Sequence, residues 1–299
     1  MWNELNGIKA PNYSKNKPYK GYNGNQFNIN NILDVRRHLE KLFNCNSKQM
    51  VFHGVEFGVN TTPIFNPKLF VKGLLYHRNS EFQFSYYRNT ALAEHQRWRF
   101  KIYSKSFQYE MEQYVLRIEL KIVKMEDINC RIDNKGKANK NYVGIKTFAD
   151  VRESTIKKAK ELLLKRFDEV MYYDYTINKK TLSGTNLKNI ENYSNQNYWI
   201  NDLESNRRDR PKNNLKSIII KNSDNLHQQI RNNIIERCVI NNRLSESSKC
   251  VIINPLTILL STTQKGTKKR DVIYPKKEDT KTAVIGGCGN TNHYLLGRN

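Results

Sequence analysis

Two consecutive segments between residues 97 and 125 alternate charged and apolar side chains at every second position. This period is typical of strands that bury one face of an antiparallel sheet. On the charged side, Glu119 is the only acid among basic and tyrosyl side chains. A face this basic favours a polyanionic partner over water alone. We predict that nucleic acid contacts it through Arg97, Arg99, Lys101, Tyr103, Lys105, Arg117 and Lys121.

The whole chain is also strongly basic. Its 299 residues contain 51 Lys and Arg against 28 Asp and Glu, which gives a formal net charge of +23 and favours DNA as the partner. The sequence has no apolar run of about 18 residues, and residues 1–22 lack the apolar core of a signal peptide. We therefore expect a soluble, cytoplasmic protein without a membrane partner. An alternative is an accessory protein whose charge reflects only an AT-rich genome.

The order of apolar patterns predicts an α+β fold. We expect an antiparallel sheet with helices on one face and an open basic face, plus a smaller, mainly helical C-terminal region. A long amphipathic helix should begin near Thr147. The expected divisions are a flexible basic arm over 1–28, an α+β, nuclease-like DNA-binding domain over 29–180, a linker over 181–214 and a C-terminal accessory region over 215–299.

A second acid lies on another predicted strand, residues 51–60, where Glu56 is flanked by two glycines on one face. Glycine in a strand often marks the close approach of a ligand or of another backbone. If Glu119 shares this face, the two carboxylates can hold a divalent metal, because hard cations take oxygen ligands. The alternative is a cross-strand ion pair between Glu56 and Arg99 or Lys101. We predict that both carboxylates lie on neighbouring strands, on the helix-free face.

The segment KIYSKSFQYEMEQYVLRIELKI, residues 101–122, resembles rolling-circle replication initiators of the plasmid replication-initiation-factor class and their filamentous-phage relatives. The resemblance covers about residues 50–180. It implies that the glutamate of the R-x-E strand, here Glu119, is a ligand for Mg²⁺ or Mn²⁺. It also implies that a tyrosine further along the chain attacks the DNA phosphodiester. The candidates in VMYYDY are Tyr172, Tyr173 and Tyr175.

The segments EFGVN, GIKTFADV and NYWINDL are also similar to proteins of Bacteroidetes mobile elements. The expected function is therefore a replication initiator that nicks and rejoins single-stranded origin DNA through a metal-assisted tyrosine. A host helicase or polymerase would be a partner, because the sequence lacks a Gly-rich phosphate loop. The alternative is a non-catalytic nucleic-acid-binding protein in which Glu119 is merely ion-paired. Only the enzyme requires two acids and a tyrosine to converge on one face.

Overall fold

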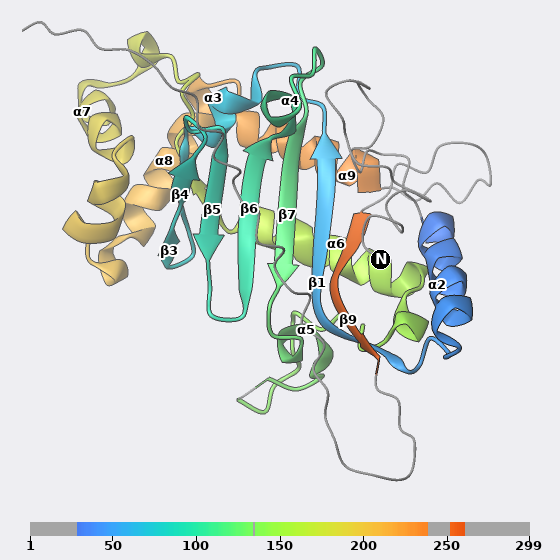
Figure 1. The fold of residues 1–299 in the computed structure, drawn as a ribbon. Coiled ribbons are helices and arrows are strands. Elements are labelled where there is room, and N and C mark those ends of the chain that lie inside the picture. Colours follow the sequence, from blue (N-terminus) through green and yellow to red (C-terminus); the bar gives the residue numbers. More distant parts are fainter. Residues whose placement is uncertain (1–28, 134, 239–251, 261–299) are drawn as a thin grey trace, which may run out of the picture. The chain divides into compact units, whose positions relative to one another are not determined.

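The main element of the computed structural model is a six-stranded antiparallel sheet with the order β4-β5-β6-β7-β1-β9 (Figure 1). The structure describes residues 29–133, 135–238 and 252–260. The strands of this sheet are β4 (Gln83–Ser85), β5 (Thr90–Glu94), β6 (Trp98–Ser104), β7 (Leu116–Ile122), β1 (Met50–Thr61) and β9 (Ile252–Leu260). A smaller sheet of order β3-β2-β8 contains β3 (Ser80–Glu81), β2 (Leu74–His77) and β8 (Val170–Tyr172).

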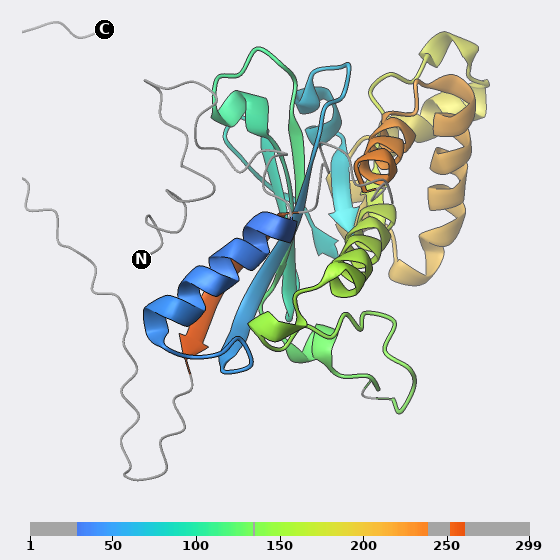
Figure 2. The ribbon, with the colours of Figure 1, turned by 90° about the vertical axis from the view of Figure 1, so that its right-hand side faces the viewer.

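Helices lie on both sides of the main sheet. Figure 2 shows α6 (Glu153–Asp168) and α9 (Leu226–Cys238) on one side, and α2 (Ile29–Phe43) and α4 (Lys105–Gln108) on the other. In Figure 1, α6 crosses behind the middle strands, whose other face is turned toward the viewer. The other helices are α3 (Pro67–Val71), α5 (Glu126–Asn129), α7 (Gly184–Tyr193) and α8 (Asp209–Asn222). The predicted α+β class is confirmed, and none of the described helices is long and apolar enough to cross a membrane.

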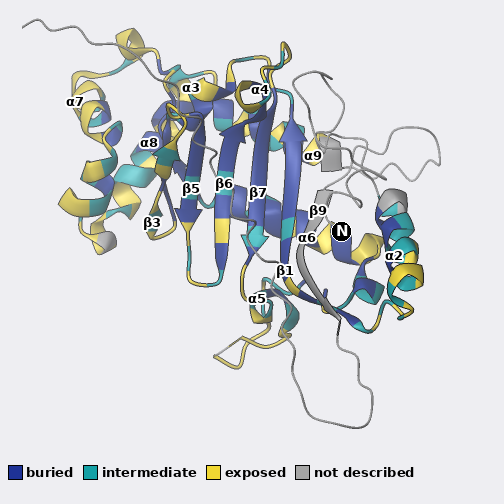
Figure 3. Cartoon of the chain, viewed as in Figure 1, coloured by how far each residue is buried: buried dark blue, intermediate teal, exposed yellow. Residues whose placement is uncertain are grey.

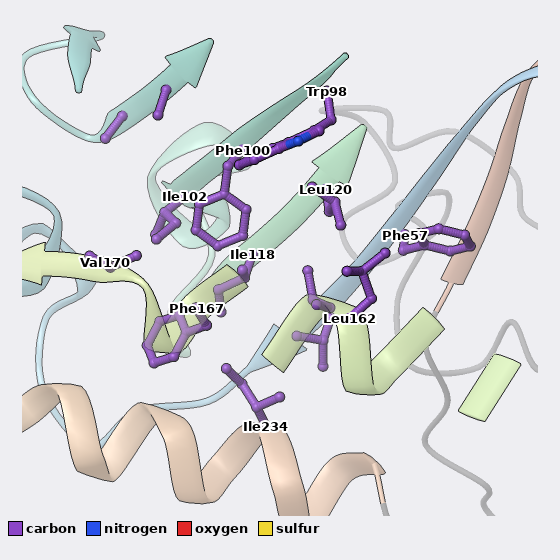
Figure 4. Close-up of a cluster of buried hydrophobic side chains, with 14 of the residues drawn as sticks. Phe57, Trp98, Phe100, Ile102, Ile118, Leu120, Leu162, Phe167, Val170 and Ile234 are labelled. Atoms are coloured by element: carbon purple, nitrogen blue, oxygen red, sulfur yellow. The ribbon is translucent and has the colours of Figure 1, made fainter. Parts of the chain in front are cut away.

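The core forms between the main sheet and α6 and α9. Phe100 of β6 pairs with Leu120 of β7, so the apolar sides of these two strands share one face. Leu162 and Phe167 of α6 and Ile234 of α9 pack into the same cluster (Figure 4). Burial of each such side chain contributes about 1.5–3 kcal/mol. The alternation of charged and apolar residues in β6 and β7 therefore directs their charged side chains away from α6.

The long helix begins at Glu153, six residues after the predicted start at Thr147. The carboxylate of Asp150 accepts hydrogen bonds from the backbone N–H groups of Lys146 at 3.0 Å and Thr147 at 2.8 Å. These bonds close a separate 3₁₀ turn, Phe148–Asp150, before α6 starts. Thr147 therefore precedes a short 3₁₀ turn, and not the long helix itself.

The expected linker over 181–214 is wrong, because most of this segment is helical. It contains α7, a π-helical turn at Tyr198–Asp202 and the start of α8. Ile190 and Trp199 are fully buried, and the Trp199 indole N–H donates to the Tyr193 carbonyl at 2.8 Å. A polar, Asn-rich composition concealed these few apolar anchors.

The C-terminal region is less separate than predicted. Its strand β9 pairs with β1 and adds an edge to the main sheet, where Pro255 is tolerated because an edge strand has one unpaired side. The described elements all fall within one unit that spans residues 1–262. The predicted basic arm, residues 1–28, lies outside the described residues, as do 239–251 and 261–299.

Candidate functional site

Cross-strand pairing brings the two predicted acids onto one face. In the central strand β7, Glu119 is in register with Lys101 of β6 on one side and with Gly58 of β1 on the other. The next position on that face pairs Lys121 with Glu56. Directly paired residues project to the same side of a sheet, and this side is opposite the apolar face that packs on α6. Glu56 and Glu119 therefore lie on neighbouring strands and share the face away from α6, as predicted. This face is not free of helices, because α2 and α4 lie on the same side of the sheet.

Glu119 belongs to a buried ion-pair network. Its Oε1 accepts a hydrogen bond from Arg117 Nε and another from the Tyr103 hydroxyl at 3.0 Å. Arg117 Nη1 also donates to Asn60 Oδ1 at 3.1 Å. Arg117 is only 1% exposed and Glu119 only 8%, so both charges are largely removed from water. Most of β7, the strand that carries them, is coloured as buried in Figure 3. The network joins three strands, β6, β7 and β1.

The protonation states follow from this geometry. Burial by itself raises the pKa of Glu119. The charge and hydrogen bond of Arg117, together with the charge of Lys101 and the Tyr103 hydroxyl, outweigh burial and lower the pKa below its usual range. Burial, followed by the charge of Glu119, raises the pKa of Tyr103. Glu119 is therefore a carboxylate at neutral pH, and the protonated Tyr103 hydroxyl donates to it.

Gly58 makes room for this network. A Cβ atom at this position would lie 2.7 Å from Arg117 Nη2 and 3.2 Å from Glu119 Cγ. Separations below about 3 Å would force one of these packed groups to move. The glycine does mark a close approach, as predicted, but the approaching group is the Arg117 side chain of the neighbouring strand.

The contacts of Glu119 also decide whether the predicted Mg²⁺ or Mn²⁺ fits. Arg117 Nε binds the carboxylate directly, and the ammonium groups of Lys101 and Lys105 act on the same buried region. Within the described ranges, no three His, Cys, Asp or Glu side chains are grouped to hold a metal ion. Mg²⁺ is usually held by one or two carboxylates together with several waters, but here the Arg117 guanidinium already binds Oε1 of Glu119 and repels a second cation. Glu119 and Glu56 in this arrangement do not fit the metal.

Neighbouring strands also neutralise part of the predicted basic face. Arg99 Nε forms an ion pair with Glu94 Oε1 of β5 at 2.8 Å. The residue opposite Glu56 is Lys121, and not Arg99 or Lys101 as considered above. Glu94 therefore offsets a charge that looked uncompensated when β6 and β7 were considered alone.

The seven predicted nucleic-acid contacts differ in accessibility. Four are at least partly accessible, namely the exposed Arg99 and the half-buried Arg97, Lys101 and Lys121. The other three, Tyr103, Lys105 and Arg117, are buried. The prediction is wrong for these three, because Tyr103 and Arg117 bind Glu119 inside the protein and Lys105 is buried as the first residue of α4.

Lys105 is buried because β6 ends just before it. The Ser104 hydroxyl accepts from the Phe107 N–H at 3.1 Å and caps α4, and the Lys105 N–H donates to the Val115 carbonyl at 2.8 Å. Burial and, next, the Arg117 charge lower the pKa of Lys105 to about 7. At neutral pH its amine is only partly charged, which does not suit a permanent phosphate contact.

Two of the three predicted nucleophiles are in the core. Tyr172 and Tyr173 are both buried, on and just after β8. The Tyr172 ring lies 4.6 Å from the Phe70 ring and 6.4 Å from His227 of α9, so it occupies the side of the sheet opposite Glu119. Burial raises the pKa of both tyrosines. Neither converges with the acids, so the prediction of a catalytic role is wrong for both.

Tyr175 differs from the other two candidates because it is 42% exposed. The Lys72 ammonium lies 4.1 Å from the centroid of its ring. Both residues line a cavity of about 350 Å³ together with residues 194–197. Tyr175 thus remains a candidate for contact with a ligand.

A histidine pair that the sequence did not predict lies on the α6 side. His77 Nε2 donates to the Arg166 carbonyl at 2.8 Å, so its bare Nδ1 accepts from His95 Nε2 at 3.0 Å. Burial lowers the pKa of His77 to about 3 and, with Arg78, that of His95 to about 4. His95 stacks on the core residue Trp98, at 3.8 Å between ring centroids. The pair is therefore neutral and lies across the sheet from Glu119.

The described site is thus a structural ion-pair network with accessible cations around it, and the predicted convergence of acids and tyrosine is not formed at Glu119. No protein-family model, curated protein or solved structure matches the chain.

Proposed function

We propose that this protein binds nucleic acid for a mobile element, and that Glu119 organises the binding face without taking part in chemistry. The supporting observation is which cations the acidic side chains pair with. Every ion pair within 4 Å that joins two described residues has arginine or histidine as its cation. Lysines such as Lys101, Lys121, Lys157 and Lys158 therefore form no ion pair within 4 Å with another described residue. In a chain of net charge +23, such lysines favour a polyanion.

Binding should weaken steeply as salt rises, because each neutralised phosphate releases counterions. The double change Lys101→Glu and Lys121→Glu should weaken binding to unrelated DNA sequences and should reduce the slope of log affinity against log salt by about 0.7–0.9 per lost contact. Fluorescence anisotropy with labelled oligonucleotides measures both quantities.

The matched control is Lys180→Glu with Lys188→Glu, which changes the net charge equally at exposed positions outside the sheet. If the control weakens binding as much as the test variant, overall charge and not this face determines affinity. Binding that does not respond to salt would contradict the proposed function itself.

Nicking of DNA is a second candidate, which the exposure of Tyr175 and the nearby Lys72 ammonium favour. In this reaction the tyrosine oxygen would bond to phosphorus and the 3′ oxygen would leave, so the protein would become joined to the DNA 5′ end.

Incubation with single-stranded origin DNA and Mg²⁺ or Mn²⁺ should then give a detergent-stable adduct. Tyr175→Phe should abolish the adduct, whereas Tyr173→Phe should retain it. Failure of the wild-type protein to form any adduct would leave the binding function alone.

A further inference from the structure

The turn between β4 and β5 exposes two adjacent tyrosines. Tyr86 and Tyr87 are 72% and 86% exposed. Together with Arg88 they have φ angles of 50°, 55° and 60°, three consecutive left-handed residues of which none is glycine. L-residues with side chains rarely adopt this conformation, and it persists only where neighbouring contacts enforce it.

Asn89 supplies those contacts. Its backbone N–H and its side-chain amide both donate to the Tyr86 carbonyl, each at 3.0 Å. The Asn89 carbonyl in turn accepts from the Ser104 N–H of β6 at 2.8 Å. The turn is therefore fixed to the main sheet, which reduces the entropy that its tyrosines would lose on binding a partner.

Beside this turn lies the cavity of about 350 Å³ that Tyr175 lines. Its two aromatic rings each have a cation nearby: Arg88 Cζ lies 4.8 Å from the Phe84 ring, and Lys72 Nζ lies 4.1 Å from the Tyr175 ring. Glu81 also lines the cavity, so the walls contain one acid with the two cations. The volume is within the range of small-molecule sites, roughly 300–1,000 Å³.

Another part of the cavity wall is preformed. The Gln196 side-chain amide donates to the Leu75 carbonyl at 2.6 Å and to the Phe82 carbonyl at 3.0 Å, which fixes residues 194–197 against β2. Ser194 and Asn195 line the cavity beside it and add polar groups. The cavity thus combines flat apolar surfaces, cations and hydrogen-bonding groups in one place.

We propose that this cavity and the adjacent turn bind single-stranded nucleic acid, with unpaired bases on the rings of Tyr86, Tyr87 and Tyr175 and phosphates beside Lys72 and Arg88. Aromatic side chains stack on bases only when the bases are unpaired, and cations beside the rings suit the alternation of base and phosphate along a strand. A proline-rich peptide would also use the rings, but it would make no use of the cations. The proposal rests on the proposed nucleic-acid-binding function and assigns it a site and a strand form.

The test compares the full chain with the double variant Tyr86→Ser and Tyr87→Ser, by anisotropy on oligothymidylate and on a duplex of the same length. Loss of stacking should weaken oligothymidylate binding at least about tenfold while the duplex affinity changes little. The salt slope should stay unchanged, because no charge is removed, whereas Lys72→Gln with Arg88→Gln should reduce it. Tyr114→Ser, at a tyrosine that is 41% exposed outside this cluster, is the matched control and should bind as the wild type does.

Thermal unfolding of each variant establishes that the fold is retained. If the wild-type chain binds neither oligonucleotide, the proposed function fails and this site fails with it. If the wild-type chain binds with a clear salt dependence and the tyrosine variant binds oligothymidylate equally well, only the site is overturned. Equal weakening on duplex and single strand would also overturn it. So would binding of a proline-rich peptide that the tyrosine variant loses while it retains oligothymidylate.

Discussion

Glu119→Leu is expected to lower the free energy of unfolding by about 3–5 kcal/mol, as found when one partner of a buried ion pair is removed. The change leaves the Arg117 guanidinium, 1% exposed, without its carboxylate. It also removes the acceptor of the Tyr103 hydroxyl. Urea denaturation followed by circular dichroism measures the effect as a shift of the midpoint at constant slope.

The control for this prediction is the double variant Arg117→Met with Glu119→Leu. Replacing both charges by apolar groups of similar size removes the unpaired charge, so the double variant should recover much of the lost stability. A Glu119→Leu protein as stable as the wild type would show that the pair does not hold the sheet together. Full stability combined with loss of a DNA-cleaving activity would instead restore Glu119 as a catalytic residue.

The strands that contain this pair are predictable from the sequence because their signal is local. Alternation within β6 and β7 specifies which side chains face α6, and the same rule places Glu56 and Glu119 on one face. The face on which a side chain lies depends only on its position along its own strand. The fold class and the shared face of the two acids were accordingly predicted correctly.

The charge balance of that face depends on which strands lie side by side. Glu94 reaches Arg99 only because β5 lies beside β6, and Glu56 is opposite Lys121 only because β1 lies beside β7. The alternation within a single strand does not indicate which strands pair with it. The same limit applies to Tyr103, whose position on the charged face was predicted but whose burial beside Glu119 was not.

The tyrosines of VMYYDY show a different limit. A short strand that follows a long helix has too few residues for its period to be read, so the local pattern does not distinguish β8 from the end of α6. Its pairing with β2 buries Tyr172 and Tyr173, while Tyr175, beyond the strand, stays exposed. The His77–His95 contact likewise depends on β2 packing beside the main sheet, which no local pattern indicates.

Acid is expected to destabilise the protein well before its carboxylates titrate. His77 has a pKa of about 3 in the folded protein, against about 6.5 when unfolded, because burial disfavours its charged form. Below pH 6.5 the unfolded chain therefore takes up a proton that the folded protein excludes. The free energy of unfolding should fall by about 1.4 kcal/mol per pH unit for this group, or about 2 kcal/mol between pH 6.5 and 5.

The half-buried His95 and the histidine of α9, His227, also have lowered pKa values and act in the same direction. Urea midpoints between pH 7 and 5 measure the combined slope. His77→Gln keeps a donor for the Arg166 carbonyl but cannot take up a proton, so its slope should be shallower than that of the wild type by one proton. Equal slopes for the two proteins would mean that His77 is not held neutral by its burial. A shallower slope would identify the histidine pair as the acid-sensitive element of the core.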